Sequence, residues 1–137
     1  MSEFKWPVRV YYEDTDCGGV VYYANYLKFM ERARTEFLRK LGYEQDILNR
    51  EQGIIFAVRS VSIDYLKPAR FNDSLDVSCK LVEVGKASLL FDQIIKRTVD
   101  QTVVLCTAQI KIVCLDAQTF RPKTIPADVV AEISSEN

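Results

Sequence analysis

The chain has 137 residues, the usual length of one domain, so we expect a single domain over residues 1–137. Hydrophobic residues make up 48% and charged residues 27% of it, which argues against a disordered protein. The formal net charge of -1 argues against nucleic-acid binding, and the absence of histidine excludes Ser-His-Asp and Cys-His catalysis and histidine-based metal sites.

The first residues predict a cytoplasmic protein that begins with a strand. Met1–Pro7 has no apolar signal-peptide core, and no apolar run approaches the ~20 residues that a membrane span needs. We therefore expect no membrane span. Val8–Tyr12 reads as a strand, with Pro7 at its start, where a missing N–H is tolerated.

A turn rich in functional groups follows this strand. Residues 13–26 combine carboxylates, a thiol, three tyrosines and the pair Gly18-Gly19, which marks a tight bend or a close approach of a ligand. The following helix would direct free N–H groups and a positive dipole end at this turn. A carboxylate such as Asp16 and the helix start, if both face one small space, could respectively attack and polarise a carbonyl, although Asp16 could also simply fix the turn.

Residues 24–41 predict a long helix that ends at Gly42. Its apolar residues fall on one face at 3.6-residue spacing. Arg34 is the exception, because its position lies inside the apolar arc. We expect an ion pair with Glu31 or a side chain that reaches out to solvent.

The rest of the chain predicts strands. Residues 43–52 are polar and irregular, with a short second helix as one interpretation, and residues 127–133 predict a short amphipathic tail helix. Between them, apolar residues alternate over 55–65, 75–81, 89–95 and 104–114, separated by turn signals at 68–73, 85–86 and 100–101. Three of the four cysteines fall on apolar strand faces, where we expect reduced core residues: Cys79, Cys106 and Cys114.

This order of elements predicts an α+β fold, in which a curved antiparallel five-stranded sheet wraps one long helix. Short connections make neighbouring strands antiparallel, and their common apolar face needs the single long helix as its cover. The open strand edges and the second sheet face need cover too, so we expect an oligomer.

Several segments resemble the hotdog-fold acyl-CoA thioesterases, most closely the group associated with the Tol–Pal system and next the 4-hydroxybenzoyl-CoA thioesterases. The segments that carry the resemblance are Val8–Tyr22, Glu31–Glu36, Tyr65–Arg70 and Val113–Asp116. The Asp-x-x-Gly turn before the helix is the most specific of these features. The similarity spans nearly the whole chain.

The resemblance implies a homotetramer built from dimers, with active sites between subunits. It implies that Asp16 is the catalytic carboxylate and that the backbone N–H of Tyr23 polarises the thioester carbonyl. The Tol–Pal group usually has histidine where this chain has Tyr23, whereas the 4-hydroxybenzoyl-CoA relatives have tyrosine there. Asp16 could act as a general base or as a nucleophile, and the sequence leaves both open. Cys17, beside it, is a spacer rather than a nucleophile, since nothing but the helix start would lower its pKa.

Further residues are candidates for substrate binding, each with a structural role as the alternative. Gly19, Tyr22 and Tyr26 lie at the turn and the helix start, where glycine clears space and tyrosine packs or contacts the substrate. Coenzyme A carries phosphates, for which the candidates are Arg59, Lys67, Arg70 and Lys86. Ser88 could orient the water or the thioester.

We therefore expect an enzyme that hydrolyses the thioester of a short-chain or aryl acyl-CoA to the free acid and CoA. An acyl thioester on acyl carrier protein is the other substrate considered. No metal or redox cofactor is expected, and coenzyme A enters only as part of the substrate. The alternative from another class is a non-catalytic hotdog scaffold that binds acyl groups or acyl carrier protein.

Overall fold

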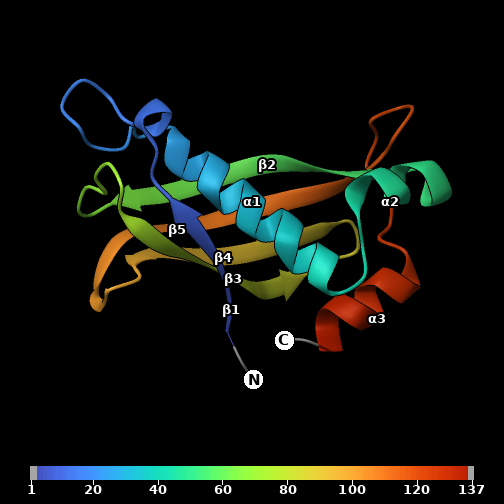
Figure 1. The fold of residues 1–137 in the computed structure, drawn as a ribbon. Helices are drawn as coiled ribbons and strands as arrows, with labels where there is room; N and C mark the ends of the chain where they lie inside the picture. The colour runs from blue at the N-terminus through green and yellow to red at the C-terminus, as the bar shows by residue number, and fades with distance from the viewer. Residues whose placement is uncertain (1–2, 136–137) are drawn as a thin grey trace.

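A five-stranded antiparallel sheet with one long helix laid across it forms the body of the protein, in a computed structural model that describes residues 3–135 (Figure 1). The strands are β1 (Phe4–Arg9), β2 (Ile54–Tyr65), β3 (Ser74–Val84), β4 (Ser88–Arg97) and β5 (Asp100–Asp116). The helices are α1 (Asn25–Lys40), α2 (Gln45–Gln52) and α3 (Ala127–Ser135), with a 3-10 turn, η1, at Tyr12–Asp14. The strand order is β1-β3-β4-β5-β2. The predicted α+β hotdog architecture is confirmed.

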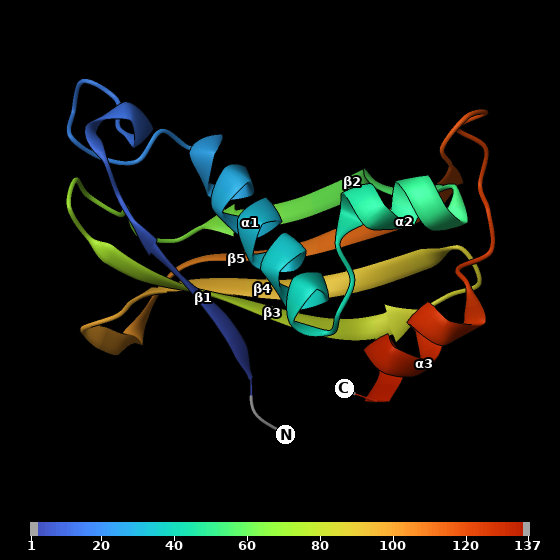
Figure 2. The same cartoon turned by 45° about the vertical axis from the view of Figure 1, so that its right-hand side comes forward.

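The core lies between α1 and the facing side of the sheet (Figures 1 and 2). On β4 the buried side chains alternate with half-buried ones, as the period of two predicts, and β3 and β5 follow the same pattern except at the buried runs 77–79 and 105–106. Phe29, Met30 and Ala33 of α1 are fully buried, and Phe37 packs edge-on against Phe91 of β4 with ring centroids 5.8 Å apart. Each large apolar side chain buried in this way contributes about 1.5–3 kcal/mol.

The long helix begins and ends within one residue of the predicted limits. It runs from Asn25 to Lys40, and Gly42 follows with φ +96, the left-handed conformation expected after a helix end. The suggested second helix and the tail helix are both present. Cys79, Cys106 and Cys114 are buried and unpaired, as predicted.

Two element boundaries were predicted wrongly. The first strand is Phe4–Arg9 rather than Val8–Tyr12, because Asp14 Oδ2 accepts the Tyr11 N–H at 2.8 Å and the chain turns there into η1. Pro7 lies inside this strand, at the sheet edge, where its missing N–H costs no ladder bond. The expected turn at 100–101 lies instead at residues 98–99, and Asp100 already belongs to β5.

Arg34 is buried as its position indicated, but its partner is not Glu31. Its Nη1 donates to Gln93 Oε1 at 2.9 Å, and no ion pair with Glu31 forms. Gln93 Nε2 in turn donates to the carbonyl oxygens of Met30 and Ser78, at 3.0 and 3.3 Å. Gln93 is completely buried and links β4 to α1 and β3.

The strand β2 lies at one edge of the sheet and leaves that edge unpaired. It pairs only with β5, and five consecutive residues in its middle, 58–62, are exposed. A register shift between Val58 and Ser60 marks a bulge in this stretch. Within residues 3–135, no helix is both long and apolar enough to cross a membrane.

Candidate active site

The predicted turn is a small hairpin between β1 and α1, which we call the Asp16 hairpin (Thr15–Val21). Thr15 and Val21 form an isolated antiparallel bridge at its base. Inside it, the Asp16 N–H donates to Val20 O at 2.9 Å, and the Gly19 N–H donates to Asp16 O at 3.1 Å. Main-chain hydrogen bonds therefore determine where the Asp16 side chain stands.

The two glycines are needed for different reasons. Gly19 has φ +80, a conformation that residues with a side chain rarely adopt. Gly18 donates its N–H to Asp16 Oδ1 at 2.8 Å, and a Cβ on Gly18 would lie only 3.2 Å from that oxygen. A side chain at position 18 would therefore press on the carboxylate that the hairpin presents.

The Asp16 carboxylate is exposed and only partly engaged. Oδ1 accepts the Gly18 N–H, and Oδ2 accepts no hydrogen bond from any residue in the described range 3–135. A carboxylate with a free oxygen and access to solvent can take a proton from water or attack an electrophilic carbon.

The start of α1 supplies free donors to the same region. The Tyr22 N–H is used, donating to Asp14 O at 2.9 Å, and the Asn25 N–H donates to Tyr22 O at 2.8 Å. The N–H groups of Tyr23 and Ala24, by contrast, donate to no residue that the structure describes. Free N–H groups at a helix start carry partial positive charge, so they can stabilise a developing oxyanion.

Aromatic side chains surround this helix start. Tyr23 packs against Tyr22 and against Tyr65 at the end of β2, with ring centroids 4.9 and 6.0 Å away. Tyr22, Tyr23 and Tyr65 are all at least 44% exposed, so their rings line a surface that a substrate can reach. Repulsion between the ionised forms of the two adjacent phenols, Tyr22 and Tyr23, raises the pKa of Tyr22, and burial raises the pKa of Tyr65, so the phenols of Tyr22 and Tyr65 are neutral at pH 7.

Tyr26 differs from the other predicted tyrosines. It is only 4% exposed, and its hydroxyl accepts the Ala69 N–H at 3.0 Å. Burial is the main cause that raises the pKa of Tyr26. Its ring packs against Tyr65 and Phe29 inside the protein.

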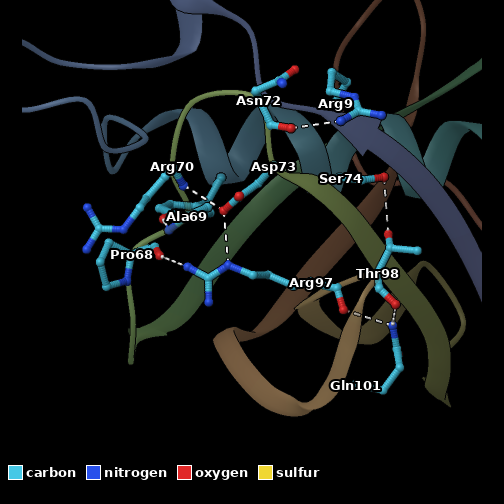
Figure 3. A network of polar contacts seen from close by, with 11 residues as sticks. Arg9, Pro68, Ala69, Arg70, Asn72, Asp73, Ser74, Arg97, Thr98 and Gln101 are labelled. Carbon is cyan, nitrogen blue, oxygen red and sulfur yellow. Dashed lines mark hydrogen bonds and ion pairs between the residues drawn. The ribbon is translucent and has the colours of Figure 1, made fainter.

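The segment Pro68–Asp73, which we call the strap, lies directly against the Asp16 hairpin. Arg70 forms an isolated bridge with Val20, and its exposed side chain extends away from the network in Figure 3. Lys67, also exposed, directly precedes the strap. Of the four predicted phosphate-binding residues, Arg70 therefore lies beside the turn within one chain, whereas the Lys67 N–H donates to Leu105 O on β5.

Three other predicted residues are not brought to the hairpin within one chain. Lys86 and Ser88 lie at the β3–β4 connection, at the end of the sheet near α3 and opposite the Asp16 hairpin (Figure 1). Arg59 is exposed in the middle of β2. These three could meet an Asp16 hairpin only if it came from another copy of the chain.

Some residues that hold the site were not identified from the sequence. Arg97 at the end of β4 donates from Nε to Asp73 Oδ2 at 3.0 Å and from Nη2 to Pro68 O at 2.7 Å (Figure 3). The turn signals at Pro68 and Asp73 marked a connection, but no pattern linked it to Arg97. Among residues 3–135 there is no group of three or more Cys, Asp or Glu side chains placed to hold a metal ion.

Comparisons with known proteins identify the family of this chain. Residues 10–133 match the model of the thioesterase-like superfamily. The chain is 46% identical over 128 residues to the acyl-CoA thioesterase YbgC of Haemophilus influenzae, covering 93% of this chain and 92% of that protein. It is 43% identical over 129 residues to the acyl-CoA thioester hydrolase YbgC of Escherichia coli O6:H1, covering 94% of each.

A solved structure supports the same relationship. The probable thioesterase from Bartonella henselae superposes with a TM-score of 0.85 at 31% identity, covering 91% of this chain and all of that one. On the family match, the two relatives and this structure, the chain belongs to the thioesterase-like superfamily.

Proposed function

We propose that the protein is an enzyme that hydrolyses acyl-CoA thioesters to the free acid and CoA, with Asp16 and the backbone N–H of Tyr23 as its catalytic groups. One observation carries this proposal: an exposed carboxylate with a free oxygen lies one short hairpin away from two unused helix-start N–H groups. The relatives named above are thioester hydrolases. No similarity reported above favours the non-catalytic scaffold.

The chemistry follows from the two groups. The N–H of Tyr23, with Ala24 beside it, holds the thioester carbonyl oxygen and stabilises the oxyanion as attack proceeds. Asp16, as general base, takes a proton from water while the water oxygen bonds to the carbonyl carbon. The tetrahedral intermediate collapses, the C–S bond breaks, and the CoA thiolate leaves and takes up a proton.

Asp16 could instead attack the carbonyl carbon itself and form a mixed anhydride, which water then hydrolyses. The two routes differ in whether the protein becomes acylated. Rapid acid quenching during turnover, followed by intact-protein mass spectrometry, separates them. A mass increase equal to the acyl group at Asp16 supports the nucleophilic route, and its absence at all quench times supports the general base.

The binding of CoA is assigned to the basic residues. Arg70 lies against the Asp16 hairpin and Lys67 directly precedes the strap; both are exposed, and we assign both to the CoA phosphates from the same chain. Arg59 and Lys86 are assigned to phosphates, and Ser88 to the water or thioester, as contributions from a neighbouring copy. Gly19 leaves room for the thioester, and Tyr22 offers its ring to the substrate.

A second copy is expected at the edge of β2. The exposed stretch 58–62 has free main-chain groups on one side, and pairing with another β2 would satisfy them. Antiparallel pairing would place the Tyr65 end of one strand, with its Asp16 hairpin, beside the Phe56 end of the other. We propose a homotetramer built from such dimers. Light scattering at micromolar concentration should give a tetramer or at least a dimer, and a fully active monomer would contradict it.

The proposal that the acyl group is short or aromatic is supported by a cavity. It measures about 360 Å³ between α1 and the sheet, with a mostly apolar lining that includes Leu38, Phe56, Leu89 and Phe91. Phe56, one of its lining residues, lies at the end of β2 to which the proposed dimer would bring the neighbouring hairpin. The limited size and the aromatic floor suit a short aliphatic chain or one ring.

The test is release of free thiol from a panel of acyl-CoAs of increasing chain length and of aryl-CoAs, read with a thiol reagent. The same acyl groups, carried as thioesters on acyl carrier protein, form the second set of substrates. We expect activity on CoA substrates and its persistence after exhaustive chelation, because no residue pattern in the chain calls for a metal. No thiol release from any member of either set would refute the enzyme.

A further inference from the structure

The strap, Pro68–Asp73, forms main-chain hydrogen bonds to residues before the Asp16 hairpin and to residues within it. It makes two main-chain hydrogen bonds to Val10, both 2.9 Å long, before the hairpin. It makes one to Gly19 O at 3.2 Å and one from the Val21 N–H at 2.9 Å within the hairpin. The exposed glycine turn therefore takes its position from a second, distant segment of the chain.

Tyr26 extends this connection to the helix start. Ala69, in the strap, accepts the Val21 N–H with its carbonyl oxygen and donates its own N–H to the Tyr26 hydroxyl at 3.0 Å. Ala69 is fully buried, so this N–H has no access to water as a replacement partner. Tyr26 lies in the first turn of α1, three residues after Tyr23. One buried residue of the strap thus joins the hairpin that carries Asp16 to the helix that carries the proposed oxyanion donors.

Arg97 holds the strap from the opposite side. Its two bonds reach both ends of the strap, Asp73 and Pro68, and the same Asp73 oxygen accepts the Arg70 N–H at 2.9 Å (Figure 3). Arg97 belongs to the end of β4, in the rigid sheet. The sheet therefore fixes the strap without any contribution from the hairpin.

We propose that Tyr26 and Arg97 are positioning residues for the reaction. They act through the strap and fix the position of the Asp16 carboxylate relative to the helix-start N–H groups. This inference rests on the proposed function. A short isolated hairpin is at best marginally stable, so the Asp16 hairpin needs such support. Oxyanion donors and a base must be held closely in place, since a displacement of about 1 Å can cost about 10²-fold in rate.

Tyr26→Phe tests the link to the helix, and Tyr43→Phe is its matched control. Each substitution removes one tyrosine hydroxyl that bonds a main-chain atom, because the Tyr43 hydroxyl donates to Asp128 O at 3.0 Å. Tyr43 lies beside α3, away from the Asp16 hairpin (Figure 2). Both variants are assayed with one acyl-CoA at a temperature where circular dichroism shows them folded.

The expected result is a split between kcat and KM. Tyr26→Phe should lower kcat by roughly 10-fold or more with KM changed less than about 3-fold, as expected when fixed groups lose their alignment. Tyr43→Phe should keep the wild-type kcat even if it melts earlier. Equal kcat values for both variants and the wild type would overturn the proposal, as would a fall in kcat that Tyr43→Phe shares.

Arg97→Gln gives a second, independent arm, which also serves if Tyr26→Phe does not fold. It removes the ion pair to Asp73 and should lower kcat with little change in KM. Because both residues act through the strap, the double variant should lose less than the product of the single losses. Normal kcat in a folded Arg97→Gln protein would remove Arg97 from the proposal, and fully independent effects would contradict a shared strap.

These outcomes are distinct from failure of the proposed function. If the wild-type protein releases thiol from no acyl-CoA, the proposed function itself is wrong. If the wild type is active and both variants keep its kcat, only the positioning role is wrong.

Discussion

Two polar clusters, one at the start of α1 and one in its middle, differ in whether their polar groups have hydrogen-bond partners. At the start of α1, the Asp16 hairpin is exposed, one oxygen of its carboxylate is free, and the N–H groups of Tyr23 and Ala24 have no partner among the described residues. In the middle of α1, Arg34 is 8% exposed and bonded to Gln93, which is completely buried. Of these two clusters, the one with unpaired groups is the one that water and a substrate can reach.

This difference separates a site for chemistry from a structural cross-link. A buried polar group must be paired, because leaving it without a partner costs about 1–3 kcal/mol. Arg34 and Gln93 meet that requirement and link α1 to the sheet. At the hairpin, solvent supplies the missing partners until a ligand replaces it. Substitutions at the first cluster should therefore change activity, and those at the second should change stability.

The largest expected effect comes from Tyr23→Pro, which removes a main-chain donor and not merely a side chain. The Tyr23 N–H makes no internal hydrogen bond in the described structure, and proline is tolerated where helices start. The loss of one oxyanion donor should lower kcat by about 10²–10³, or roughly 3–4 kcal/mol.

Two substitutions at the same position serve as controls. Tyr23→Phe and Tyr23→His keep the N–H and should retain most activity. Circular dichroism must show that the proline variant is folded, since proline also restricts Tyr22. A folded proline variant with normal turnover would refute the oxyanion role, and inactivity of Tyr23→Phe would assign the chemistry to the phenol.

Asp16→Asn should lower kcat by roughly 10² or more and leave stability nearly unchanged. The amide oxygen can still accept the Gly18 N–H, so the hairpin keeps its shape. Steady-state kinetics and a thermal melt check the two halves of this prediction. Turnover within a few-fold of the wild type would remove Asp16 from the mechanism.

Arg34→Met should have the reverse profile. Methionine has a side chain of similar length but no donor for Gln93 Oε1. The free energy of unfolding should therefore fall by about 2 kcal/mol. The melting temperature should fall by several degrees. Because Arg34 also lines the cavity assigned to the acyl group, turnover is measured on folded protein at saturating acyl-CoA, where kcat should stay within a few-fold of the wild-type value. A large loss of kcat without a loss of stability would reverse the contrast between the two clusters.

The smallest effect is a difference in thiol reactivity. Burial raises the pKa of Cys79 and of Cys106 to about 12, and it raises the pKa of Cys114 as well, whereas Cys17 is exposed in the hairpin. At pH 8 a raised pKa keeps these three thiols protonated and unreactive. A thiol reagent should label one cysteine in the native protein and all four after denaturation. Rapid labelling of a second thiol would mean that the core opens readily.

The sequence predicted the features that repeat along the chain. The 3.6-residue spacing of apolar residues located α1 and its buried face, and the alternation of residues located β3, β4 and β5. The position of Arg34 inside the apolar arc marked it as an exception, but the structure has neither the ion pair with Glu31 nor the side chain reaching out to solvent that we expected. The resemblance to thioesterases directed attention to Asp16 and Tyr23, and their catalytic roles stay predictions until they are tested.

Contacts between distant residues were not predictable in the same way. Arg34 and Gln93 are separated by 59 positions, and the nearer Glu31 was the more obvious partner. The strap meets the Asp16 hairpin through main-chain atoms, which leave no trace in the choice of side chains. The end of β1 was misplaced because Asp14 binds the Tyr11 N–H, a local competition that the apolar pattern does not report.

Because the strap contacts the hairpin through main-chain atoms, the side chains at this site can vary without loss of those contacts. Gly19 and Val21 are held through their backbone atoms, and among the described residues no side-chain hydrogen bond from positions 17, 22 or 23 holds the hairpin in place. Mutation can therefore alter these three positions, and with them the shape and polarity that a substrate meets, while the support stays constant. The exchange of histidine and tyrosine at position 23 is the kind of variation that such a scaffold tolerates, and libraries varied at these three positions should yield many folded proteins.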